Sequence, residues 1–313
     1  MIRYVLFLVP FLSFGQSFAP EPGVVGSTAM HRDSSSFIFW ASDAVITRGP
    51  LDIQNVSLGD ASYGVNEDVG GFPDGVGVVS LGDAGEALVT FPAVISNGPG
   101  PDFAVFENGF IDHYMEFAFV EVSSDGIQFF RFDAISEIPT DTQLTNFSTS
   151  DCRYVNNLAG KYRANYGTPF DLDELQGTPG LDVNSITHIK LIDVVGSIDP
   201  AYGSYDSQGS IINDPYPTPF ESCGFDLDAI GVIHSTSAGV EEKLLSMNCY
   251  PNPVVDVLHL PEEIDSGQLC NANGLVVQVI EGKTIDVSSL CSGVYFVHFS
   301  VNGQWFNQKV TKL

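Results

Sequence analysis

Short β-prone runs recur along most of the chain, and this recurrence restricts the fold more than any other feature of the sequence. The runs are rich in β-branched and aromatic residues and are bounded by Gly, Pro, Asn and Asp, which are typical of turns. Long stretches with helical periodicity are absent. Eight runs joined by some long loops predict an all-β domain over residues 20–235, a two-sheet sandwich of the jelly-roll type. The runs are 36–41, 77–81, 87–91, 102–107, 117–122, 129–132, 186–193 and 225–233.

The charge balance restricts the partners. Twelve Lys and Arg stand against 39 Asp and Glu, so that the formal net charge is −27. A surface this acidic repels the phosphate backbone, which excludes nucleic acid as a partner. The same surface favours bound cations.

The first residues have the features of a signal peptide. Arg3 precedes an apolar run over residues 4–14, which is too short to span a bilayer as a permanent anchor. Small residues at Ser13 and Gly15 predict a signal peptide over residues 1–15, with cleavage before Gln16. Since no other segment is long and apolar enough for a membrane helix, we expect no transmembrane segment in the mature chain.

The last residues predict a second, smaller β domain over 245–313, after a linker at 236–244. Residues 255–260 roughly alternate apolar and polar side chains, as a half-buried strand does. Asn273-Gly274 and Asn302-Gly303 lie between β-prone runs and fit tight hairpin turns, because both residue types tolerate positive φ. These patterns predict a small sandwich.

The order and spacing of several short motifs in this small domain resemble the C-terminal sorting domain of type IX secretion cargo. The motifs are Tyr250-Pro251-Asn252-Pro253, 256–258, Asn273-Gly274, 285–290, 293–296 and 309–313. The resemblance implies an immunoglobulin-like sandwich without chemistry of its own, recognised by the type IX secretion machinery and usually cleaved during export. The localisation that it implies is the outer cell surface or the medium, reached via the periplasm.

The large domain also resembles a known group. Residues 97–108, 119–126, 157–162, 166–172 and 224–232 are similar to segments of a family of secreted bacterial surface proteins, some of which are associated with cobalamin capture. The layout is also similar to galactose-binding-like jelly rolls, in which a structural calcium is common. The resemblance implies a binding domain for a small molecule or glycan, with cobalamin as one candidate.

Asp226 and Asp228 form the clearest candidate metal site. Residues two apart in a strand point to the same side, so we expect Phe225, Leu227 and Ala229 on one face and both carboxylates on the other. Two adjacent like charges require a cation, an arginine or open water. Calcium takes six to eight oxygen ligands, and the additional oxygens are expected from Asp102, Glu107 and Asn108. A solvated or Arg-paired strand edge is the alternative.

The loop from Asp199 to Asp214, which runs into the Pro-rich residues 213–220, is the candidate ligand site. Long polar and aromatic loops on a rigid sandwich frequently carry recognition. The aromatic side chains are candidates for stacking on a sugar or planar ligand, and the acidic ones for accepting its hydrogen bonds. These residues are Tyr202, Tyr205, Asp206, Asp214, Tyr216 and Phe220. The alternative is a loop that packs its own aromatic residues.

Enzymatic and adhesive functions are alternatives to a binding function. A carbohydrate-active hydrolase requires two carboxyl groups on opposite sides of one bond, and Glu107, Glu116 and Glu121 are the candidates. The sequence contains neither a Gly-x-Ser-x-Gly motif nor a Gly-rich phosphate loop, and its histidines lack zinc-site spacing. We therefore favour a binding protein over an enzyme. A structural or adhesive surface protein is the third hypothesis.

The five cysteines allow disulfides but do not fix their pairing. Cys152–Cys223 and Cys270–Cys291 are candidate bridges, and buried free thiols are the alternative.

Overall fold

The computed structural model describes residues 18–236, 249–260, 264, 266–271, 275–280, 282–301 and 304–313. The predicted signal peptide, most of the predicted linker and the two Asn-Gly turns lie outside the described residues. The chain divides into two compact units, Met1–Ala238 and Gly239–Leu313.

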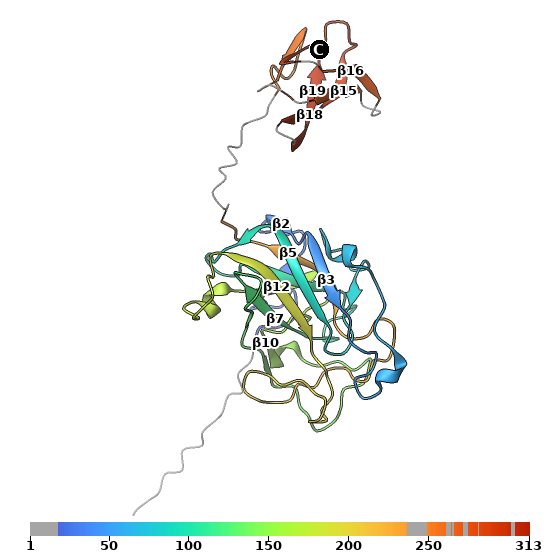
Figure 1. The fold of residues 1–313 in the computed structure, drawn as a ribbon, viewed down its shortest axis with the longest axis vertical. Helices are drawn as coiled ribbons and strands as arrows, with labels where there is room; N and C mark the ends of the chain where they lie inside the picture. The colour runs from blue at the N-terminus through green and yellow to red at the C-terminus, as the bar shows by residue number, and fades with distance from the viewer. Residues whose placement is uncertain are drawn as a thin grey trace, which may run out of the picture. The chain divides into compact units, whose positions relative to one another are not determined.

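The large unit is a sandwich of two sheets whose described strands pair antiparallel (Figure 1). The first sheet has the order β1 (Met30–His31), β11 (Tyr166–Phe170), β6 (Phe103–Glu107), β13 (Asp226–Val232) and β2 (Phe39–Trp40), and β4 (Val79–Ser80) also pairs with β13. The second has the order β3 (Asp43–Thr47), β5 (Glu86–Ile95), β12 (Ile186–Asp193), β7 (Ala118–Ser123) and β8 (Phe130–Arg131). Strands β3 to β7 pass alternately from one sheet to the other, as do β11 to β13. The all-β prediction is confirmed.

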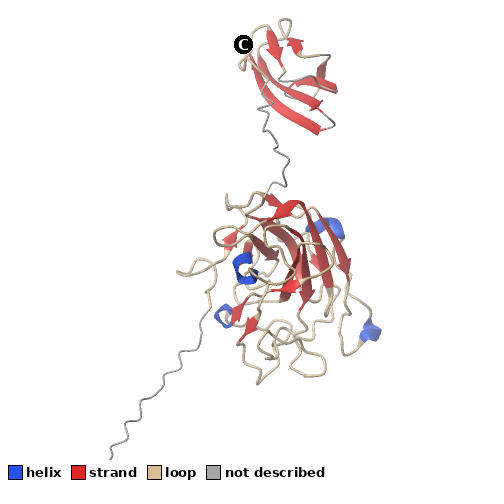
Figure 2. Cartoon of the chain, turned by 60° about the vertical axis from the view of Figure 1, so that its left-hand side comes forward, coloured by secondary structure: helices blue, strands red, loops and turns tan. Residues whose placement is uncertain are grey.

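Short elements lie in the connections between these strands. A two-stranded ladder joins β9 (Ile135–Ser136) and β10 (Val155–Asn156). Four 3-10 turns are drawn as the blue elements in Figure 2, and they are η1 (Val56–Leu58), η2 (Asn66–Val69), η3 (Cys152–Tyr154) and η4 (Leu172–Leu175).

The two sheets bury one apolar core between them. Strand β12 alternates as a half-buried strand should, because Ile186, Ile189 and Leu191 are fully buried while Lys190 is partly exposed. Strand β13 is buried along its whole length, since it lies between β6 and β2 with a second sheet against one face.

A bulge in β13 changes which of its side chains face this core. The register shifts between Leu227, which pairs with Glu107, and Ala229, which pairs with Phe106. Phe225 and Leu227 therefore belong to the core between the sheets, whereas Ala229 packs with Phe106 on the opposite face. The strict alternation expected over these residues fails for Ala229, because the extra residue reverses the phase.

Gly160 brings a loop against the strand that begins at Ala118. Ala118 and Ala159 form an isolated antiparallel bridge, and Gly160 follows with φ +83°. A Cβ at this position would overlap the carbonyl oxygen of Glu116. The loop therefore requires glycine for its backbone conformation and for close approach.

The second unit has a core of its own. It contains β14 (Val257–His259) paired with β17 (Thr284–Asp286), and a four-stranded sheet in the order β16 (Val276–Val279), β15 (Ser266–Asn271), β18 (Gly293–Val301) and β19 (Gln304–Lys312). Leu258, Leu269, Val297 and Phe299 are among its buried residues.

All five cysteines lie among the described residues and are free thiols, with Cys291 exposed and the other four buried. Neither candidate disulfide is therefore present in this structure. Among the described residues no helix is long and apolar enough to cross a membrane.

We predict that Gly160→Ala lowers the free energy of unfolding by at least ~2 kcal/mol, because it adds a steric overlap with Glu116 to an unfavourable positive φ. Gly177→Ala is the matched control, since Gly177 has φ +82° and open space around its Cβ position. That variant should lose only about 1 kcal/mol. Urea unfolding of both variants measures the difference, and equal losses would contradict the packing role of Gly160.

Candidate functional site: an acidic cavity with an aromatic rim

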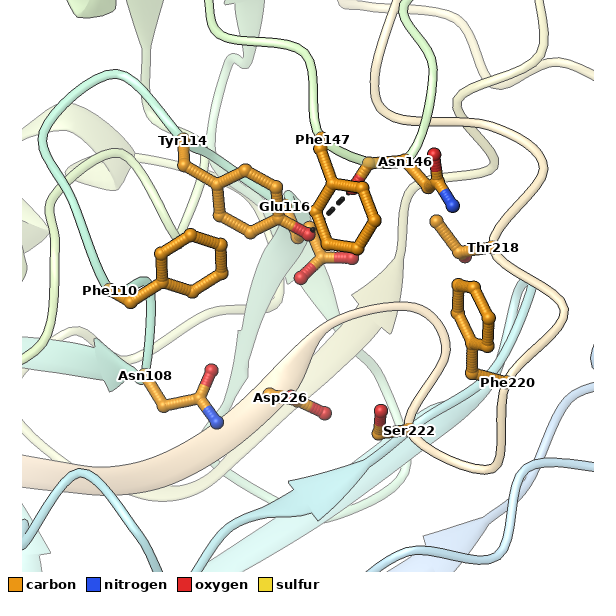
Figure 3. Close-up of a pocket in the computed structure, with 10 residues that line it drawn as sticks. All are labelled: Asn108, Phe110, Tyr114, Glu116, Asn146, Phe147, Thr218, Phe220, Ser222 and Asp226. Atoms are coloured by element: carbon orange, nitrogen blue, oxygen red, sulfur yellow. Dashed lines mark hydrogen bonds between the residues drawn. The ribbon is translucent and has the colours of Figure 1, made fainter.

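A cavity of about 440 Å³ lies among loops of the large unit. Figure 3 shows the side chains that line it, with the Glu116 carboxylate drawn in the middle of the group. The lining residues come from the β6–β7 connection, the loop near residue 146 and the segment that leads into β13. They are Asn108, Phe110, Tyr114, Glu116, Asn146, Phe147, Thr218, Phe220, Ser222 and Asp226.

Strand pairing places a buried carboxylate, Glu107, next to Asp226, which lines this cavity. Glu107 is the last residue of β6 and pairs with Leu227, so it lies beside Asp226 at the start of β13. The Ser80 hydroxyl donates a hydrogen bond to Asp226 Oδ1, and the Asn108 side chain also bonds this carboxylate. Glu107 Oε2 accepts a hydrogen bond from the amide of Gly109 at 2.7 Å. Glu107 Oε1 is buried without a hydrogen-bond partner among the described residues.

Glu116 is the third carboxylate and stands just before β7. Burial raises its pKa to about 8, and the negative charge of Asp226 contributes to the rise. Its carboxyl group is within hydrogen-bond reach of the Tyr114 hydroxyl, which donates to the carbonyl oxygen of Asn146 at 3.3 Å. A protonated Glu116 is therefore compatible with this hydrogen-bonded chain.

Burial raises the pKa of all three acids, and the charge of neighbouring acids adds to this rise for Glu107 and Glu116. Burial raises the pKa of Glu107 well above its usual value, and the charges of Glu116 and Asp226 add to this effect. Burial also raises the pKa of Asp226 to about 6, against the opposing effects of its hydrogen bonds and of Arg48. Arg48 directs its donors to the carbonyl oxygens of Tyr63, Gly64 and Ser80. The cavity therefore concentrates negative charge whenever its acids ionise.

Three exposed phenylalanines surround the acids. Phe147 is 71% exposed, Phe110 is 63% exposed and Phe220 is 49% exposed. Phe110 stacks on the buried Tyr114 with ring centroids 4.5 Å apart. Exposed aromatic rings beside buried polar groups are typical of small-molecule sites, where ring faces supply contact area and polar groups supply orientation.

The residues predicted to bind calcium fall into two sets. Asp226 and Asn108 line the cavity, and Glu107 is buried beside Asp226. Asp102 instead accepts hydrogen bonds from the amides of Gly98 and Leu172 and from His234 Nδ1, all at 2.7–2.8 Å.

Asp228 also lies apart from the cavity acids. It accepts hydrogen bonds from the amides of Asp74 at 3.2 Å and Gly75 at 2.9 Å. The carboxylates of Asp102 and Asp228 thus hold loops in place. Asp228 lies at the bulge in β13 and bonds loop amides, whereas Asp226 lines the cavity.

The residues predicted to bind a ligand are also divided. Phe220 lines the large cavity, whereas Tyr205 and Asp206 line a smaller one of about 130 Å³. Asp206 accepts hydrogen bonds from the amides of Ser136, Gln208 and Ser210, so it orders its own loop.

Three further members of that set lie outside the large cavity. Tyr216 is buried and donates to Asp52 Oδ1 at 2.6 Å. Asp214 is buried and accepts from the amide of Phe117 at 2.9 Å. Tyr202 is 40% exposed.

Several members of the cavity have no recognisable signal in the sequence. Phe110, Tyr114 and Phe147 lie in loops without periodicity, and tertiary contacts alone bring them together. Glu121, the other hydrolase candidate beside Glu116, instead forms ion pairs with Arg131 at 2.8 Å and Lys190 at 3.1 Å.

We predict that stability without divalent cations falls as the pH rises. The folded pKa values of Asp226 and Glu116 exceed their ordinary values of 3.8 and 4.5. Protonation of the two acids therefore contributes its full stabilisation of the folded state below pH 3.8 for Asp226 and below pH 4.5 for Glu116. It is lost as the pH passes about 6 for Asp226 and about 8 for Glu116. Glu116→Gln should reduce this loss by on the order of 1–3 kcal/mol.

Thermal unfolding in a chelator between about pH 5 and about pH 8 measures the slope. Glu86→Gln is the matched control, because Glu86 is exposed on β5. An identical slope for the wild type and Glu116→Gln would show that Glu116 ionises normally.

Comparison with known protein families finds a match for the small unit. Residues 248–312 match the family described as the secretion system C-terminal sorting domain. No curated protein and no solved structure matches the chain. The small unit is therefore a type IX sorting domain, which engages the type IX machinery and directs export to the cell surface or the medium.

Proposed function

We propose that the large unit is a carbohydrate-binding module that the sorting domain delivers to the outside of the cell. The observation that carries this proposal is the acidic cavity with its rim of exposed phenylalanines. A sugar offers apolar C–H faces for stacking on aromatic rings and hydroxyl groups for carboxylate and amide oxygens. Both kinds of partner lie together in this cavity.

The size of the cavity favours a saccharide over an enclosed corrinoid. Its volume of about 440 Å³ lies near the lower end of the range of about 300–1,000 Å³ for small-molecule sites. One or two sugar rings fit such a volume. A cobalamin would place only a part of its structure inside, so it is the second candidate ligand.

Calcium is the cofactor that we propose for this cavity. Glu116 and Asp226 supply carboxylate oxygens from the cavity wall, the buried Glu107 beside Asp226 supplies a third carboxylate, and the amide oxygen of Asn108 adds a neutral ligand. The unpaired Oε1 of Glu107 is the specific observation that fits a cation, because a buried acceptor without a partner is costly. A bound calcium supplies positive charge there, and sugar hydroxyls are oxygen ligands of the kind that calcium accepts.

A glycoside hydrolase is the second candidate function, and the pKa values favour it. Glu116, with a pKa of about 8, is protonated at neutral pH and is suited to donate a proton to a leaving group. Asp226, with a pKa of about 6, is mostly ionised at neutral pH and is suited to act as the base or nucleophile. Both side chains line the same cavity.

We predict that calcium raises the melting temperature by roughly 5–10 °C at about 100 times its Kd. Glu107→Gln and Asp226→Asn should abolish the shift, because each removes a charged oxygen ligand. Asp228→Asn is the matched control, since it alters a buried carboxyl group that binds loop amides outside the cavity. A melting curve that calcium leaves unchanged at about pH 8 removes the ion from the proposal.

We predict that Phe110→Ala and Phe147→Ala each weaken glycan binding roughly 10-fold, because each removes a stacking face. The probes are an array of mono- to oligosaccharides and cyanocobalamin, and calorimetry measures the affinity of any that bind. Tyr202→Ala and Tyr205→Ala are controls that alter exposed aromatic residues outside this cavity.

The outcomes separate the candidates. Binding that survives both Phe substitutions and fails in the Tyr variants would move the site to the 199–214 loop. Tight binding of cyanocobalamin without binding of any glycan would show that the ligand is a corrinoid and not a saccharide. If the wild type cleaves a saccharide into shorter products while the Glu116→Gln variant binds it and leaves it intact, the large unit is a hydrolase instead.

A further inference from the structure

Three metal-ligating side chains converge away from the acidic cavity's carboxylates. Glu21 lies in the segment before β1, His113 lies in the β6–β7 connection and Cys152 opens η3. Each offers one ligand atom, and these atoms all lie within 4.8 Å of one another. A shift of less than about 1 Å per atom would bring them to the separations found around one tetrahedral ion.

Backbone hydrogen bonds hold the three segments together. The amide of Phe18 donates to the carbonyl oxygen of Arg153 at 3.0 Å, which fixes the segment carrying Glu21 beside η3. The amide of Ser150 donates to the carbonyl oxygen of His113 at 2.8 Å. The convergence therefore rests on the framework of the fold and not on the side chains alone.

One imidazole nitrogen of this group lacks a partner, and the thiol makes only long hydrogen bonds. His113 Nδ1 is buried and lacks a hydrogen-bond partner in the part of the chain that the structure describes. Its residue also has φ +71°, which is uncommon outside glycine. Cys152 is 1% exposed, and its Sγ is 3.9 Å from both Glu21 Oε2 and the carbonyl oxygen of Ala19.

We propose that Glu21, His113 and Cys152 form a site for a zinc-like divalent transition metal. Thiolate, imidazole and carboxylate are ligands that Zn²⁺ accepts together, and three protein ligands leave a fourth position for water. Calcium and magnesium are excluded, since they take oxygen ligands. Binding releases the Cys152 thiol proton to solvent, so the thiolate and the Glu21 carboxylate balance the charge of the ion.

The neighbouring charges are compatible with this assignment. Lys161 lies near Cys152, but its ammonium group donates to the carbonyl oxygen of Val155 at 2.7 Å. Arg153 is paired with Asp151 at 2.5 Å. Burial raises the pKa of the Cys152 thiol to about 11, so without a metal it is a poor nucleophile.

The site would join the start of the described chain to the loop that frames the cavity. Glu21 is close behind the predicted cleavage point before Gln16, while His113 is near Phe110 and Tyr114 in the same connection. A metal at this place cross-links the mature amino-terminal segment to the β6–β7 connection.

Cobalt binding tests the proposal directly. The chain from Gln16 to Leu313 is titrated with Co²⁺, which replaces zinc and reports a bound thiolate by a near-ultraviolet charge-transfer band and tetrahedral geometry by intense visible bands. We expect one equivalent with both signatures, displaced by Zn²⁺. Cys152→Ser should abolish the charge-transfer band, and Glu21→Gln and His113→Gln should weaken Co²⁺ binding at least ~10-fold.

Two controls match the chemistry of the altered residues. Cys291→Ser removes an exposed thiol and His31→Gln removes an imidazole beside an acid, and both should leave the titration unchanged. A wild type without the charge-transfer band, or a Cys152→Ser variant that keeps it, would overturn the proposal. Glu21→Gln alters a partly exposed side chain, so it remains informative if Cys152→Ser fails to fold. Full-strength binding by a folded Glu21→Gln protein would remove Glu21 from the site.

Discussion

Backbone amides, more than cationic side chains, satisfy the buried acids of this protein. With 39 acidic and 12 basic residues, the chain cannot pair most carboxylates with Lys or Arg. Asp193 shows the alternative, since its two oxygens accept from the amides of Phe225 at 2.7 Å and Ala84 at 3.0 Å. Asp102, Asp206 and Asp228 do the same in other loops. Each of these acids orders a loop against the sandwich, so the positions of the loops depend on these bonds.

The cavity acids stand out because they depart from this rule. Glu107 has one oxygen on an amide and the other without a partner, and Glu116 has a tyrosine hydroxyl within reach. These groups remain costly to ionise, whereas a loop-ordering acid gains amide donors in exchange for water. A carboxylate that the fold leaves incompletely satisfied is available for a ligand or a cation. Asp214 shares this property outside the cavity, since its Oδ1 also lacks a partner among the described residues, so what sets the candidate site apart is the grouping of three such acids beside exposed aromatic rings.

The strands were largely predictable, and the exceptions have local causes. Residues 186–193 were expected and form β12 with these bounds. Strand β11 was not expected, because Gly167 and Pro169 are typical of turns, yet it pairs between β1 and β6. The cavity was predictable only in part, since Asp226 and Asp228 look equivalent in sequence. Distant loops decide between them, because residues 74–75 reach Asp228 and residues 107–116 reach Asp226.

The sorting domain and the sandwich each contain a self-sufficient interior. Every described residue of the main sandwich core lies between Ala41 and Val232, and the core of the small unit lies between Cys249 and Val310. A protease that cut the chain between residues 236 and 249 would therefore strip no buried methyl group from either interior. Each unit would thus keep its whole hydrophobic interior after such a cut.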